Sequence, residues 1–257
     1  MSPLVRVAIG MISVAAVVTA WYVATASHGH QPMVDPLKLP SPSDVIEAHR
    51  HLGSNYNEFA FVTLKRVVVG LCLGTAIGTI IAILMVRFDV FFAILDPLIQ
   101  LLRPVPAPAL IPFFILWLGL SDASQIGLVT LACFMVVVTS VMGASRNVGR
   151  VYLRAAGCLG ANRTVVTVSV IWPLCVPEVI AGLRVAAGTS FGTTVAAEFL
   201  GAEGGLGYLI RNARTTLATD AILLGIVSLG VEALVLDGLL RGGLLFFTRW
   251  QDTESQQ

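Results

Sequence analysis

Residues 67–86 read VVVGLCLGTAIGTIIAILMV, a run of 20 residues without a charged side chain that is bracketed by Arg66 and Arg87. A helix needs about 20 mainly apolar residues to cross a hydrocarbon layer about 30 Å thick. The run therefore predicts a transmembrane helix, and several other parts of the chain share its character.

Five further segments are predicted to cross the membrane. They are residues 7–26, 104–120, 123–145, 176–200 and 221–240. The intervening residues 90–102 are apolar but broken by Pro97, which indicates an interfacial or cytoplasmic helix before a span with an irregular, proline-rich start. Long solid runs exclude a transmembrane barrel, whose strands would alternate with a period of two. The predicted fold class is an all-α integral membrane protein with six transmembrane helices.

The composition agrees with this fold class. Of the 257 residues 56% are hydrophobic and only 12% are charged, whereas soluble domains carry about 25% charged residues. The net charge of +1 lacks the basic footprint of a nucleic-acid-binding protein. One alternative stays open for the first segment, because Ala24-Thr25-Ala26 resembles a signal-peptidase site, although a signal core is normally only 7–15 residues long.

Motifs for catalysis are missing from the sequence. A P-loop needs a lysine after its second glycine, and the two lysines, Lys38 and Lys65, have no such context. The four cysteines are isolated, so metal-thiolate and redox sites are not predicted. The four histidines form two H-x-H pairs, residues 28–30 and 49–51, but a helix over the second pair would separate its rings, and we predict no metal site.

Glycines recur at four-residue spacing in two of the predicted spans. Gly70, Gly74 and Gly78 form a double G-x-x-x-G, and Gly188 and Gly192 repeat the spacing in the fifth span. Such positions let a neighbouring helix backbone approach closely. We expect them to pack helices, either as static contacts or as surfaces that slide during function.

Ionisable residues inside a bilayer are costly and need an explanation. Arg184, Glu198 and Glu232 fall within predicted spans and are candidates for a polar pathway. Asp237 and Arg241 are four residues apart and can pair on one helix face. The alternative for these groups is that they lie near helix ends and extend to the membrane surface.

The densest basic segment separates the fourth and fifth spans. It holds Arg146, Arg150, Arg154 and Arg163, with no acidic residue between positions 145 and 177. The excess of arginine predicts a cytoplasmic loop and, by counting spans, two cytoplasmic termini. The first three arginines are spaced by four and would form one stripe on a helix interrupted near Gly160. The loop either only orients the protein or also engages a partner.

This loop resembles the E-A-A-x-x-x-G-x(9)-I-x-L-P loop of bacterial ABC importer permeases. Ala155-Ala156, Gly160 and Val170–Pro173 have its spacing, with Arg154 in place of glutamate and Trp172 in place of leucine. Residues 39–250 further resemble the nitrate/sulfonate/taurine permeases, with the greatest likeness to those for taurine. The segments that carry this second resemblance are residues 39–45, 63–66, 95–97, 103–106, 117–119, 182–184 and 196–198.

The resemblance implies a type I ABC importer permease that works as a dimer in the bacterial inner membrane. Two separate subunits would bind ATP and Mg, and a periplasmic or lipid-anchored binding protein would deliver the solute. Residues 1–38 would form an N-terminal helix and outer segment, 39–250 the permease core with a coupling loop at 146–173, and 251–257 a cytoplasmic tail. The residues expected to couple to the ATPase are Arg146, Arg150, Arg154, Ala155, Ala156, Gly160, Trp172 and Pro173.

Taurine or another sulfonate is the solute that the resemblance favours, while nitrate, thiamine precursors and aromatic acids remain alternatives. Two other classes stay open on the residues alone. An ion-coupled secondary transporter would use intramembrane acids such as Glu232. A structural membrane subunit would have no pathway at all.

Overall fold

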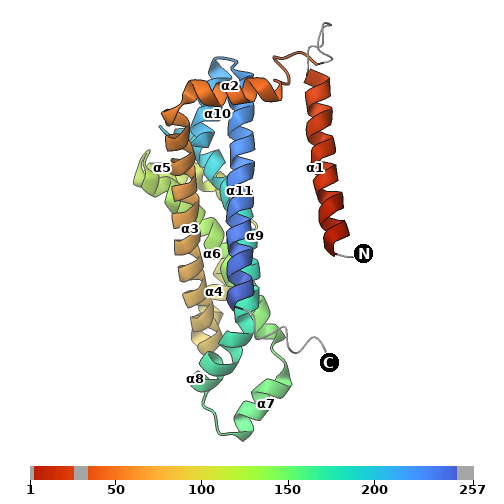
Figure 1. The fold of residues 1–257 in the computed structure, drawn as a ribbon. Helices are drawn as coiled ribbons and strands as arrows, with labels where there is room; N and C mark the ends of the chain where they lie inside the picture. The colour runs from red at the N-terminus through yellow and green to blue at the C-terminus, as the bar shows by residue number, and fades with distance from the viewer. Residues whose placement is uncertain (1–2, 26–33, 248–257) are drawn as a thin grey trace.

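The computed structural model describes residues 3–25 and 34–247, and these residues form helices without any strand (Figure 1). The helices are α1 (Pro3–Thr25), α2 (Pro42–Leu52), α3 (Ser54–Arg87), α4 (Asp89–Leu102), α5 (Ile111–Leu118), α6 (Asp122–Asn147), α7 (Arg150–Cys158), α8 (Arg163–Val166), α9 (Trp172–Gly201), α10 (Leu206–Thr215) and α11 (Thr219–Phe247). A 3₁₀ turn at Ala107–Leu110 precedes α5, and a π turn at Thr167–Ile171 joins α8 to α9. The all-α membrane fold is therefore confirmed.

Five helices of the described chain, α1, α3, α6, α9 and α11, are long and apolar enough to cross a membrane. Residues 104–120, predicted as a span of their own, do not form one continuous helix. Helix α5 has only 8 residues, which is about 12 Å of helix, and α4 and α5 are bent by 92° relative to each other. The number of spans is six only if this bent pair counts as one broken span. The four prolines after Arg103 explain the break.

Helix α4 was expected at the membrane surface, but it belongs to the bundle. Ile99 is buried in the main apolar core, and Phe92 and Leu95 pack against that core. Residues of α3, α6 and α9 make up the rest of its centre, with Val129, Cys133 and Val137 of α6 fully buried. The core thus lies between the three long helices α3, α6 and α9.

The two ends of the bundle differ in construction. Helix α2 lies across one end, next to α10, while α7 and α8 project from the opposite end, where α11 finishes (Figure 1). Ser41 and Asp44 cap α2 reciprocally, with Pro42 in its first turn. Helix α1 stands apart from the bundle in Figure 1, and its Trp21 Nε1 donates a hydrogen bond to the Pro40 carbonyl at 3.0 Å.

Helix α3 meets α6 along the stripe of Gly70, Gly74 and Gly78, as the sequence predicts. A Cβ atom at Gly74 would lie 2.5 Å from the Thr130 carbonyl oxygen, and one at Gly70 would lie 2.6 Å from Val129 Cγ1. For the glycines of α9 the expectation stays a prediction, because no helix of this chain covers them. A Cβ at Gly188 or Gly192 would meet no atom within 4 Å, because that face of α9 is exposed.

Replacing Gly74 with leucine is expected to destabilise the bundle by about 3 kcal/mol, because the new side chain would have to displace the backbone of α6. Gly230→Leu on α11 is a matched control, since a Cβ there meets no described atom within 4 Å. The thermal unfolding midpoint of the detergent-purified protein should fall for the first variant and stay near wild type for the second. Equal midpoints for the two variants would contradict the close contact.

Candidate functional site

The projecting loop between α6 and α9 has a defined backbone. Helix α7 ends in a Schellman motif, in which the Ala161 amide donates to the Ala156 carbonyl and the Gly160 amide donates to the Gly157 carbonyl, both at 3.0 Å. Gly160 has φ +73°, which favours glycine because a side chain is strained there. The Asn162 side chain then caps α8 by accepting a hydrogen bond from the Val165 amide at 2.9 Å.

The single arginine stripe that the spacing predicts is divided between two helices. Arg146 ends α6, where it pairs with Asp96 of α4 at 3.5 Å and lies over the Phe92 ring. Helix α6 stops before Gly149, so only Arg150 and Arg154 share α7. The prediction of one continuous stripe is therefore wrong for Arg146, whose side chain ties α6 to α4.

Helix α7 carries an exposed surface of mixed character. Arg150 and Arg154 are exposed, and so are Val151, Tyr152 and the C-cap residue Leu159, which is 87% accessible. Apolar side chains gathered on an exposed surface are typical of sites that contact another protein or a membrane. This surface, Arg150–Leu159, is called the α7 surface below.

The other predicted coupling residues lie at different depths. Ala155 is exposed, whereas Ala156 is buried. Trp172 and Pro173 form the first turn of α9, and Trp172 packs against the main core. These two residues therefore anchor the return of the chain into the bundle, while the α7 surface forms the projecting part.

Of the predicted pathway residues, Arg184 has a partner that sequence spacing could not reveal. Its Nε donates to Asp237 Oδ1 of α11 at 2.9 Å, and Arg241 Nε donates to Asp237 Oδ2 at 2.7 Å. The predicted pair of Asp237 with Arg241 is confirmed. Glu232 lies half-buried on the same helix, and its Oε2 is buried without a hydrogen-bond partner among the described residues.

Glu198 lies in a closed network at the α10 end of the bundle. Arg66 Nη1 donates to Glu198 Oε1 and to the Gly204 carbonyl, both at 2.7 Å. Arg66 Nη2 donates to Asp122 Oδ1 at 2.6 Å, and Lys65 lies 3.6 Å from the same carboxylate. The Glu198 side chain is completely inaccessible and that of Arg66 is 5% exposed, so Glu198 does not face an open pathway in this structure.

The turn between α9 and α10 is shaped around the Glu198 carboxylate. The Gly207 amide donates to Glu198 Oε2 at 2.7 Å, and the Leu206 amide donates to Thr63 Oγ1, which itself bonds Glu198 at 2.9 Å. Gly205 has φ +110°, and a Cβ atom there would collide with the carboxylate. Glu198 therefore supplies negative charge to the first turn of α10.

This network, formed by Thr63, Arg66, Asp122 and Glu198, was not predicted from the sequence. In the sequence, Glu198 lies 132 positions from Arg66 and 135 positions from Thr63, so no local spacing brings these residues together. A signal was nevertheless present, because residues 63–66 and 196–198 are two of the segments that carry the family resemblance. A buried arginine and a buried glutamate in different spans each require a partner.

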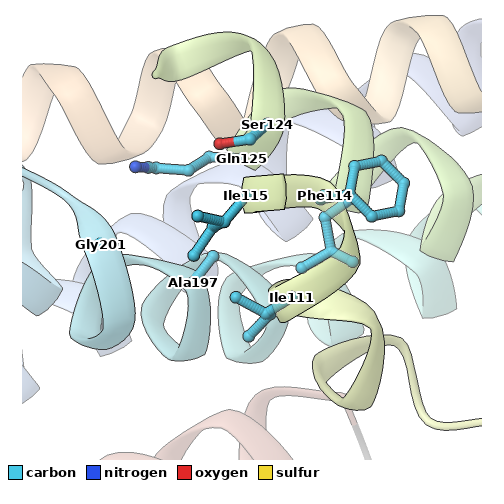
Figure 2. Close-up of a pocket in the computed structure, with 8 residues that line it drawn as sticks. Ile111, Phe114, Ile115, Ser124, Gln125, Ala197 and Gly201 are labelled. Atoms are coloured by element: carbon cyan, nitrogen blue, oxygen red, sulfur yellow. The ribbon is translucent and has the colours of Figure 1, made fainter. Parts of the chain in front are cut away.

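A small gap lies beside this network between α5, α6 and α9. Figure 2 shows Ile111 and Ile115 of α5 beside Ala197 of α9, with Gln125 above them, and Phe114 also lines the gap. The cavity measures about 10 Å³, which accommodates about one water molecule. It is too small for a transported solute.

Two larger cavities lie along α6. The first, of about 270 Å³, is lined by residues near the middle of α6 and α9 together with the turn after α4. The second, of about 330 Å³, lies between α4 and the α7 end of α6 and is more polar. Arg184, Glu198 and Glu232 line neither cavity, whereas Arg103 lines both.

The histidine pairs give no metal site among the described residues, which contain no group of three or more metal-ligating side chains. His49 stacks edge-on against Tyr56, and His51 lies 3.6 Å from Glu47. The first pair, His28 and His30, lies outside the described residues.

A bundle of long apolar helices with a broken span and cavities beside it has the architecture expected of a transport permease. The chain belongs to the family of binding-protein-dependent transport system inner membrane components, which it matches over residues 74–242. It is 34% identical to the taurine transport system permease protein TauC of Escherichia coli (strain K12), over 95% of this chain and 90% of that protein.

Other relatives carry related names. The chain is 29% identical to the putative aliphatic sulfonates transport permease protein SsuC of Bacillus subtilis (strain 168), over 90% of this chain and 83% of that protein. It is 24% identical to the nitrate import permease protein NrtB of Synechocystis sp. (strain ATCC 27184 / PCC 6803 / Kazusa), over 88% of this chain and 84% of that protein. The resemblance to nitrate/sulfonate/taurine permeases is thereby confirmed.

The fold has a counterpart among solved structures. An inward-facing conformation of the MetNI methionine ABC transporter aligns with a TM-score of 0.57 at 17% identity, over 71% of this chain and 93% of that one. The type I ABC importer permease fold is thus confirmed, and the chain is the permease component of an importer whose ATP hydrolysis belongs to separate subunits. The secondary-transporter and structural-subunit alternatives are therefore wrong.

Proposed function

We propose that this permease imports taurine or another small sulfonate. The observation that carries the proposal is the 34% identity to a taurine permease along almost the whole chain, supported by the further sulfonate permeases among its relatives. Nitrate is the second candidate, since a nitrate permease also aligns over most of the chain. All these solutes carry an oxyanion group.

We further propose that two copies of the chain form the pathway in a bacterial inner membrane, with both termini in the cytoplasm. Two ATP-binding subunits that hold ATP and Mg would bind the α7 surface, and a periplasmic or lipid-anchored binding protein would deliver solute at the α2 end. The exposed arginines and apolar side chains of α7 support the first contact. The position of α2 and α7 at opposite ends of the bundle supports their separate roles (Figure 1).

Reconstitution tests the choice of solute. The permease should be co-expressed with the ATPase and binding protein of the same importer and incorporated into proteoliposomes that contain ATP. Uptake of labelled taurine should require both the binding protein and ATP, and unlabelled alkanesulfonates should compete better than nitrate, aromatic acids or thiamine precursors. Uptake of nitrate but not of sulfonates would overturn the proposed solute while leaving the permease role intact.

A further inference from the structure

Arg103 occupies an unusual position between the two larger cavities. It is the residue that follows α4, and it lines both the cavity at mid-height of the bundle and the one toward the α7 end. Among the twelve residues that line the first cavity it is the only charged one. An arginine at this depth is costly unless something neutralises or hydrates it.

No described side chain neutralises Arg103. Its side chain makes no hydrogen bond or ion pair with any described residue. The nearest candidate, Asp96, lines the second cavity, but it pairs with Arg146 at 3.5 Å and accepts a hydrogen bond from Gln100 at 2.5 Å. Because Arg146 balances Asp96, the charged lining of the two cavities retains one uncompensated positive charge.

The backbone around Arg103 is irregular and open to the surroundings of the single chain. Residues 103–106 are not helical, and two of them are prolines without an amide hydrogen. Irregular backbone at membrane depth is tolerated only where it is buried in protein or lines a water-filled cavity. These residues are exposed in the single chain, so either a second permease copy or water in the cavities covers them.

The threonine hydroxyl groups that line the cavities have no free hydrogen to donate. The hydroxyl groups of Thr139, Thr189 and Thr193 already donate to carbonyl groups of their own helices. Arg103 is therefore the strongest donor to an oxyanion in the first cavity, while the threonine oxygens can accept from an ammonium group. Arg184, the cation that the sequence favoured, is bound to Asp237.

We propose that Arg103 binds the oxyanion group of the solute as it passes from the mid-membrane cavity to the cavity at the α7 end. The inference rests on the proposed function, because it requires an anionic solute that uses these cavities. It makes Arg103 a specificity residue of the permease, which favours sulfonates over neutral solutes of similar size.

The test uses the complete importer in proteoliposomes, with labelled taurine as the solute, and compares Arg103→Gln with Arg103→Lys. The glutamine variant should lose about tenfold or more of the uptake rate, because it removes a charge-assisted hydrogen bond. The lysine variant should lose less, because it keeps the charge but not the bidentate geometry. ATP hydrolysis stimulated by loaded binding protein should persist in both variants.

Arg6→Gln is the matched control, since Arg6 is an exposed arginine of α1 that lines neither cavity. Normal uptake by Arg103→Gln would overturn the proposal, and so would dissociation of the complex in both Arg103 variants, which would assign Arg103 to pairing between permease copies. If the wild-type complex imports no sulfonate, the proposed function is refuted, and the role of Arg103 is refuted with it. If the wild type imports taurine and Arg103→Gln equals it, only the role of Arg103 is lost.

Discussion

Glu198→Ala is expected to lower the stability of the permease by about 3–5 kcal/mol, because it removes one partner of a buried ion pair and leaves Arg66 uncompensated. The variant also leaves the Gly207 amide and the Thr63 hydroxyl without their acceptor. The unfolding midpoint in detergent should fall by about 10 °C, and α10 should lose its fixed position against α3 and α9.

The neighbouring Glu203 offers a matched control. It lies in the same turn, but its side chain is exposed, so Glu203→Ala should leave the midpoint unchanged. Glu198→Gln should fall between wild type and Glu198→Ala, because the amide oxygen can still accept the Gly207 hydrogen bond. The double variant Arg66→Met/Glu198→Leu should lose less stability than the two single variants lose together, since it leaves no unpaired partner in the Arg66–Glu198 contact. A midpoint for Glu198→Ala equal to that of Glu203→Ala would refute the structural role of the network.

The network also shows how far the sequence could be interpreted. Apolar runs predicted the long helices because a span must satisfy its backbone internally and present apolar side chains to lipid. The same rule failed for residues 104–120, whose mean composition is apolar but whose prolines divide the segment into short pieces. Length and composition identify a span only where the helix is continuous.

Contacts between helices were predictable only where a sequence pattern within a single helix indicated them. The stripe of Gly70, Gly74 and Gly78 predicts by itself that another helix approaches closely, but it does not identify α6 as that helix. The same spacing at Gly188 and Gly192 corresponds to an exposed face in this chain. The pairs of Arg184 with Asp237 and of Arg66 with Glu198 depend on how α3, α9 and α11 meet, which periodicity within one helix cannot supply.

Gly160→Trp, and separately the double change Arg150→Glu/Arg154→Glu, are expected to abolish the stimulation of ATP hydrolysis by loaded binding protein without disrupting the permease. The positions are exposed, and a Cβ at Gly160 meets no atom of the chain within 4 Å, so neither change disturbs the core. Reversing two charges on a docking surface costs several kcal/mol of binding. Stimulated hydrolysis and uptake should therefore fall by more than about tenfold.

Two conservative variants separate docking from backbone strain. Gly160 has φ +73°, a conformation that asparagine adopts at lower cost than other residues, so Gly160→Asn should retain most of the stimulation that Gly160→Trp loses. Arg150→Lys/Arg154→Lys keeps the charge of the α7 surface and should remain active. Light scattering and unfolding midpoints should show intact permease for all four proteins. Stimulation at the wild-type level in both Gly160→Trp and the glutamate variant would show that the ATPase does not bind the α7 surface.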